Sequence, residues 1–131
     1  MASVTLATCV LALNAAWDLV TGTGLLIYIH TDTLKCLADT HLGLWLYDEE
    51  RNTKVLSYAV GLFIIQWGLI RALAAMDPLA RWPDAAATYC IEGVAVAVAV
   101  VEGKAKPCSG VIVTVLCLVC IGVLIAASSS L

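Results

Sequence analysis

Five polar side chains lie inside stretches of this chain that are otherwise apolar. Asp18 and Glu92 are carboxylates, Arg71 is a permanent cation, and Asn14 and Gln66 are neutral hydrogen-bonding groups. Ionisable groups in a membrane interior are costly and mark ion pathways, proton relays or internal pairs. One hypothesis is therefore that Asp18, Gln66 and Glu92 relay protons or cations, or bind a buried polar group.

A structural use of the same side chains is the alternative hypothesis. At 1.5 Å of rise per residue, Arg71 and Glu92 differ in predicted depth by about 6 Å, which a guanidinium group bridges. We therefore predict an Arg71–Glu92 contact that faces the interior of a helix bundle. Asn14 precedes Asp18 by one turn on the same face, so Asp18 would be protonated or bonded to Asn14. Such contacts between membrane helices contribute about 0.6 kcal/mol on average.

The cysteines and histidines do not predict a metal site or a cofactor. Cys117 and Cys120 form a C-x-x-C pair deep in an apolar segment, without the second pair of a zinc site. Cys9 and Cys90 also lie in apolar segments, where cysteine behaves as a small hydrophobe. The two histidines lie in or beside a polar loop at positions 30 and 41, outside every apolar stretch.

Motifs of catalysis are not visible either. The sequence has no glycine-rich phosphate loop and no G-x-S-x-G motif, and no serine or cysteine has an evident base. We therefore expect a protein that is not an enzyme.

The elements that carry these residues are predicted by composition. Of the 131 residues, 62% are hydrophobic and only 13% are charged, far from the balance of a soluble domain. A chain this short cannot bury that much apolar surface within its own core. Lipid must therefore cover the remainder. The net charge of −3 without a basic cluster excludes nucleic acid as an expected partner.

Four stretches are long and apolar enough to span a bilayer as helices. We predict an all-α integral membrane bundle with four transmembrane helices, as one domain over residues 1–131 with spans at about 4–29, 54–76, 83–101 and 109–127. Asp77-Pro78 should end the second span, and Pro83 should lie in the first turn of the third. The first span lacks the basic segment of a cleavable signal, so we expect it to be retained.

The loop between the first two spans, residues 31–53, carries apolar residues at helical spacing. We predict a short interfacial amphipathic helix there, with Trp45 and Tyr47 at headgroup level. The alternation of Leu42, Leu44 and Leu46 leaves a strand as the alternative.

Basic residues predict the orientation. Lys35, Arg51, Lys54, Lys104 and Lys106 fall in or beside the first and third loops, whereas the opposite side holds Arg81. The positive-inside rule then places these two loops in the cytosol, or in the matrix or stroma of an organelle. We expect an endomembrane or organellar location. Of the cysteines, positions 36 and 108 fall on the same side, and they would pair only if that compartment oxidises thiols.

Small residues four positions apart predict close helix packing. The pairs are Gly68 with Ala72, Gly93 with Ala97, Ala95 with Ala99, and Gly122 with Ala126. These are more pairs than four helices need among themselves. The sequence therefore favours a lipid-embedded protein that binds other integral membrane proteins or a second copy of itself.

Residues 61–77, GLFIIQWGLIRALAAMD, resemble the second span of two groups of small four-span membrane proteins. One is the scaffold that tethers the sterol C-4 demethylation enzymes, and the other is the DoxX-like set. The shared features are a glycine entering the span, Ile-Arg near its end, a small-residue pair and an acid just after. The resemblance implies a scaffold role, with Arg71 and Glu102 as structural matches, although the histidine that precedes the acid in the scaffold family is missing here.

Three functions are compatible with these features. The first is a non-enzymatic accessory or scaffold subunit, in which Gly68→Leu or Gly93→Leu should disrupt a complex while loss of the Asp18 charge has little effect. The alternative is a small transporter or channel that uses Asp18 and Glu92. A pigment-binding or lipid-binding subunit is the third.

Overall fold

The computed structural model describes residues 2–31 and 54–129, and these ranges form four α-helices. Their bounds are α1 Ala2–Thr31, α4 Lys54–Met76, α5 Pro78–Val101 and α6 Pro107–Ser128. The interfacial helix, or alternatively the strand, was predicted within residues 31–53. Of these residues only Thr31, the last residue of α1, is described, so this prediction lies outside the described residues.

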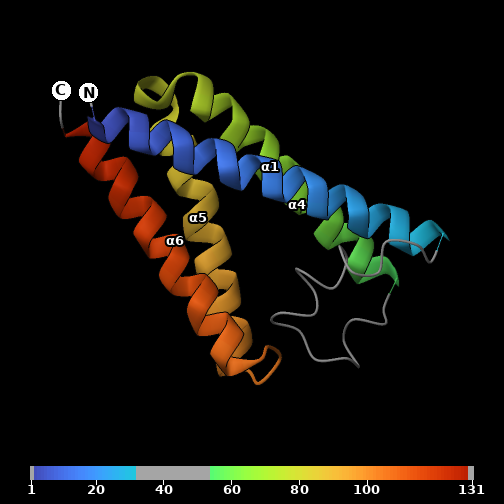
Figure 1. The fold of residues 1–131 in the computed structure, drawn as a ribbon. Helices are drawn as coiled ribbons and strands as arrows, with labels where there is room; N and C mark the ends of the chain where they lie inside the picture. The colour runs from blue at the N-terminus through green and yellow to red at the C-terminus, as the bar shows by residue number, and fades with distance from the viewer. Residues whose placement is uncertain (1, 32–53, 130–131) are drawn as a thin grey trace.

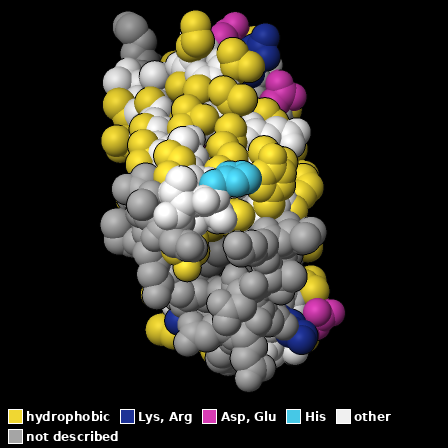
Figure 2. Space-filling model, turned by 90° about the vertical axis from the view of Figure 1, so that its right-hand side faces the viewer, with side chains coloured by type: hydrophobic (Ala, Val, Ile, Leu, Met, Phe, Trp, Pro, Cys, Tyr) yellow, Lys and Arg dark blue, Asp and Glu magenta, His cyan; other side chains and the backbone are white. Residues whose placement is uncertain are grey.

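Each of the four helices is long and apolar enough to cross a membrane, and about a third or less of each span is buried inside the bundle. The described surface in Figure 2 is mostly hydrophobic, with its acidic and basic side chains near two opposite ends. The fold is therefore the predicted all-α integral membrane bundle. α1, with 30 residues, is about 45 Å long and exceeds a 30 Å hydrocarbon core, so it must tilt or protrude.

Prolines set the helix starts, and here one prediction was wrong. Pro83 lies inside α5 rather than in its first turn, and the first turn instead contains Pro78. The Asp77 carboxylate accepts a hydrogen bond from the Ala80 amide at 3.2 Å, which caps the helix at this earlier position. α6 likewise begins at Pro107, two residues before the predicted start, since proline at the first helical position loses no hydrogen bond.

The connection from α5 to α6 is closed by a glycine in the left-handed region. Gly103 has φ of +71°, and its amide donates to the Val100 carbonyl at 3.1 Å. The Lys104 amide donates to the Ala99 carbonyl at 2.7 Å, which completes a Schellman motif. This motif turns the chain within five residues and returns it as an antiparallel helix.

The helices form two antiparallel hairpins that diverge from one end of the molecule (Figure 1). α1 packs mainly on α4, and α5 packs mainly on α6. The hairpins meet where both termini lie and separate toward the other end. α1 begins and α6 ends at this common end.

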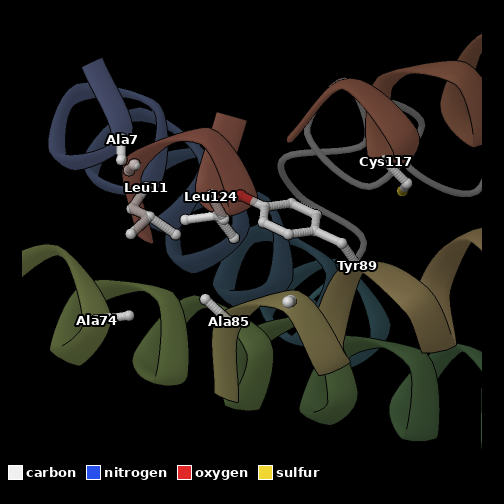
Figure 3. Packing of buried hydrophobic residues seen from close by; sticks show 9 residues of the cluster. Ala7, Leu11, Ala74, Ala85, Tyr89, Cys117 and Leu124 are labelled. Carbon is white, nitrogen blue, oxygen red and sulfur yellow. The ribbon is translucent and has the colours of Figure 1, made fainter. Parts of the chain in front are cut away.

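The core fills the end where the hairpins meet, and small side chains dominate it (Figure 3). Leu11, Tyr89 and Leu124 are its largest fully buried apolar members. The remaining buried members are Ala7, Ala74, Ala85, Ala86, Cys117 and Ala127. Because alanine adds little bulk, four helices can approach closely here.

Glycines bring α1 and α4 together along their length. A Cβ added at Gly22 would lie 2.8 Å from Ile65 Cγ1, and one at Gly61 would lie 2.9 Å from Leu26 Cδ2. A Cβ at Gly68 would lie 3.0 Å from the Cβ of Asp18. This seam therefore requires glycine on both helices, and it places Asp18 directly beside α4.

Candidate functional site

Arg71 is the hub of a polar cluster that joins three helices. Its Nη1 donates to Asp18 Oδ2 of α1 at 2.6 Å, and its Nη2 donates to Glu92 Oε2 of α5 at 2.6 Å. Its Nε donates to Thr88 Oγ1 of α5 at 3.0 Å. A planar guanidinium with several fixed donors can reach partners in different directions, which a lysine ammonium on a flexible stem does less well. We call Asp18, Arg71 and Glu92 the ion triad.

The three side chains of the triad are buried to different degrees. The side chains of Arg71 and Asp18 are 2% and 5% exposed, whereas that of Glu92 is 19% exposed. Two carboxylates surround one guanidinium, so the triad carries a formal net charge of −1. In a medium of low dielectric constant the pairing is strong, and any charge without a partner is costly.

Aromatic rings complete the surroundings of the guanidinium. Its central carbon lies 3.9 Å from the centre of the Tyr89 ring and 5.9 Å from that of Trp67, both within cation–π range. Thr88 in turn donates its hydroxyl hydrogen to the Ala85 carbonyl at 2.7 Å, which leaves its oxygen oriented toward Arg71. Arg71 is thus held by hydrogen bonds at its edge and by rings at its face.

Helical spacing explains how these groups come together. On α5, Thr88 and Glu92 are four residues apart and share one face, so both reach the same guanidinium. On α4, Arg71 follows Gly68 by three residues, and Gly68 is where α1 approaches closely enough to bring Asp18 within reach. Thr88 and Tyr89 were not predicted from the sequence, although their spacing from Glu92 was a usable signal.

The predicted Arg71–Glu92 contact is confirmed. The predicted partner of Asp18 was wrong: it is paired with Arg71, and the Asn14 amide instead donates to the Val10 carbonyl at 2.8 Å. The physical reason is that an amide is satisfied by its own helix, whereas a buried carboxylate is stabilised more by a cation.

Gln66 does not join the triad. Its side chain is exposed and lines a hollow on the outside of α4 and α5, together with Arg81 and Asp84. The relay hypothesis placed Gln66 with Asp18 and Glu92, and the structure separates it from them.

A cavity of about 250 Å³ lies against the triad, between α1 and α6. All three triad residues line it, and so does Asn14 from α1. The other lining residues are Trp17, Tyr89, Val113, Leu116, Cys117 and Cys120. The arrangement therefore places two carboxylates at the wall of a partly open hollow between the helices.

Comparison of this chain with known protein families, curated proteins and solved structures adds no relative from which a function could be transferred. No family model, curated protein or solved structure matches this chain. The role of the triad and its cavity must therefore be inferred from the side chains themselves.

Cys117 and His30 each contact a neighbouring helix. Cys117 packs against Gly93: a Cβ added to Gly93 would lie 3.3 Å from the Cβ of Cys117. His30 contacts the Tyr58 ring edge to face at the end of α1, with 6.2 Å between the ring centres. Cys108 is exposed at the start of α6, and its pairing with Cys36 concerns a residue outside the described ranges.

The predicted packing pairs divide into inward and outward sets. Gly68 contacts α1 and Gly93 contacts α6, with their partners Ala72 and Ala97 half-buried. By contrast, Gly122 has open space where a Cβ would lie, and Ala126 beside it is exposed. Two of the three glycines are thus used within the chain, and one faces outward.

Proposed function

We propose that the protein is a non-enzymatic accessory or scaffold subunit that holds other membrane proteins against its outward helix faces. The single observation that carries this proposal is the outward face of α6 at Gly122 and Ala126. Within a membrane, small residues at such a surface allow a second helix to approach its backbone closely. The resemblance of residues 61–77 to the sterol scaffold family supports the same role.

The rest of α6 suits a surface that a second protein covers. Leu118, Val119 and Ile125 are about half exposed or more, and they lie beside the small pair. Large apolar side chains around a glycine and an alanine form a shallow depression into which the ridge of a neighbouring helix can pack. Helix packing in lipid depends on such a close fit, because burial of apolar area contributes little between apolar surfaces.

The proposal includes an orientation. The Lys104 and Lys106 loop, and the loop of residues 32–53, are placed on the cytosolic side, or on the matrix or stromal side of an organelle, because they are the more basic loops. The membrane is proposed to be an endomembrane or an organellar membrane. Both termini would then face the opposite side.

The experiment that tests the scaffold role compares Gly122→Leu with the unchanged protein after gentle detergent extraction. Native mass and the identity of co-purifying proteins are measured. We expect stoichiometric membrane-protein companions with the unchanged chain and their loss with Gly122→Leu, while the helix content stays the same. Cys90→Leu, which also places a leucine at an exposed site, here on α5, is the control.

Two results would contradict the scaffold role. One is a homogeneous monomer without companions, and the other is an intact complex with Gly122→Leu. Gly68→Leu and Gly93→Leu cannot serve in this test, because both glycines contact neighbouring helices of the same chain.

The cavity supports a second candidate function, passage of a small cation along Asp18 and Glu92. Under this hypothesis Asp18→Asn or Glu92→Gln abolishes flux into proteoliposomes although the protein still folds. Unchanged flux in both variants removes this candidate.

A further inference from the structure

The cavity beside the ion triad combines apolar walls with a negatively charged end. Trp17, Val113 and Leu116 supply apolar surface from α1 and α6, and Asp18 and Glu92 supply carboxylates. A volume of about 250 Å³ holds about eight groups of the size of water, each occupying about 30 Å³. A small molecule with one polar end and a short apolar body fits this space.

The charge of the triad specifies the polar end. Each carboxylate uses one oxygen for Arg71, namely Asp18 Oδ2 and Glu92 Oε2. The second oxygen of each accepts no hydrogen bond from the residues that the structure describes. When both acids are ionised, they carry one negative charge more than Arg71 compensates, and a bound cationic group would compensate it.

A buried hydroxyl provides independent evidence for a polar ligand. Tyr89 is 2% exposed and lines the cavity, and within the described part of the chain its hydroxyl has no hydrogen-bond partner. Its ring extends from α5 toward α6, where the oxygen lies beside Leu124 (Figure 3). The thiol of Cys120 also lies close to this oxygen, but a thiol is only a weak hydrogen-bonding group. Buried polar groups without a strong partner are rare, and a polar ligand in the cavity would supply that partner.

An ammonium group matches these acceptors better than a metal ion does. It has three N–H donors, and the cavity offers the free carboxylate oxygens, the Asn14 amide oxygen and the Tyr89 hydroxyl oxygen. Among the described residues no group of three or more histidine, cysteine, aspartate or glutamate side chains is placed to hold a metal. The apolar walls would also contact an organic body, which a metal ion lacks.

We propose that the cavity between α1 and α6 binds the ammonium group of a small apolar amine. The ammonium lies between Asp18 and Glu92, on the side away from Arg71, and the apolar body contacts Trp17 and Leu116. This inference does not rest on the scaffold role, and an intact complex with Gly122→Leu would leave it unaffected.

The test uses 2-phenylethylamine and its neutral counterpart of equal size, 2-phenylethanol. Binding to the detergent-purified full chain is measured by calorimetry and by the shift in unfolding temperature. We expect the amine to bind and to raise the unfolding temperature, and the alcohol to do neither. Binding of both molecules with equal affinity, or failure of the amine to bind, would overturn the proposal.

Two variants locate the site. Glu92→Gln should weaken amine binding about tenfold or more, because it removes a charge-assisted contact. Glu102→Gln, the same change at the exposed residue that follows the last residue of α5, should leave binding unchanged. Leu116→Trp should block the cavity without altering any charge, so it keeps the test valid if Glu92→Gln does not fold. Undiminished amine binding in the folded variants would contradict the assignment.

A further binding measurement distinguishes two sources of the ammonium group, a lipid headgroup and a free amine. Binding of 2-phenylethylamine is repeated in phosphatidylcholine nanodiscs in which part of the lipid is replaced by phosphatidylethanolamine. Weaker binding in the mixed discs identifies the lipid headgroup as an occupant, whereas unchanged binding assigns the site to free amines. Both results agree with an ammonium site.

Discussion

At the residue scale, the main feature is a single arginine that satisfies two acids on different helices. Arg71 joins Asp18 of α1 to Glu92 of α5 while it is itself part of α4. The depths of Arg71 and Glu92 in the membrane were enough to predict their contact. The two residues lie in consecutive spans that cross the membrane in opposite directions, so their depths could be compared from the sequence. The contact with Asp18 depends on how α1 is rotated and how closely it approaches, and the sequence does not specify either.

Removal of the arginine should destabilise the protein strongly. Arg71→Met leaves two carboxylates in the bundle without a cation, and breaking a buried pair in this way costs about 3–5 kcal/mol. Thermal unfolding in detergent, followed by circular dichroism, measures the loss. Arg81→Met, at an exposed arginine, is the control and should change little. Equal stability of the two variants would show that the triad contributes nothing to the fold.

Neutralising one acid should be tolerated far better than removing the arginine. Asp18→Asn leaves one cation with one carboxylate, and its amide oxygen can still accept from Arg71. We expect a change within about 1 kcal/mol of the unchanged protein, the range of polar contacts between membrane helices. Thermal unfolding in detergent measures this change as well. A loss of stability as large as that of Arg71→Met would contradict the prediction for Asp18→Asn.

At the element scale, the spans were predictable and their ends were less so. Hydropathy determines where a helix must lie in lipid, so the four spans follow directly from composition. The start of α5 was misplaced because two prolines, Pro78 and Pro83, compete for the first turn. The Asp77 side chain decides in favour of Pro78, since it caps the helix there. The pairing of small residues was recognisable, but which of them face inward was not.

The α1–α4 seam should not accept a larger residue. In Gly68→Leu the new side chain meets Asp18 and Leu19, so α1 must shift and the triad loses its geometry. We expect a loss of about 1–3 kcal/mol in detergent unfolding, typical of an overpacked core. Gly122→Leu has open space around it and should unfold like the unchanged protein. Similar losses in both would refute the distinction between inward and outward glycines.

The turn between α5 and α6 should require glycine for a different reason. Gly103→Ala meets no neighbouring atom, but it places a Cβ at a φ of +71°. The left-handed conformation costs about 1–2 kcal/mol for a residue with a side chain. The unfolding temperature of the variant should fall accordingly, and an unchanged value would mean that the turn relaxes without strain.

At the scale of the whole molecule, the hairpins and their common end determine which groups meet. Four helices converge where alanines line the core, and the triad lies beside that core. The start of α1 and the end of α6 share one end of the described bundle, and so one side of the membrane. Which side that is follows from the basic loops alone and is open to direct test.

Thiol labelling can measure the orientation. In a variant that keeps only Cys108, a membrane-impermeant maleimide should label the start of α6 from the cytosolic, matrix or stromal side. A second variant, with Ser129→Cys as its single cysteine, should be labelled only from the opposite side, because α6 spans the membrane between them. The reverse pattern would invert the proposed orientation.

The pairing of Asp18 with Arg71 also has a consequence for biosynthesis. The two residues are 53 positions apart, so at about 5–20 residues per second the acid leaves the ribosome about 3–10 s before its cation. An aspartate at the centre of a lone spanning helix adds about 2.5–3.5 kcal/mol to the free energy of insertion. We therefore expect α1 to remain beside the translocon until α4 arrives, and the two helices to enter the lipid together as a neutral pair.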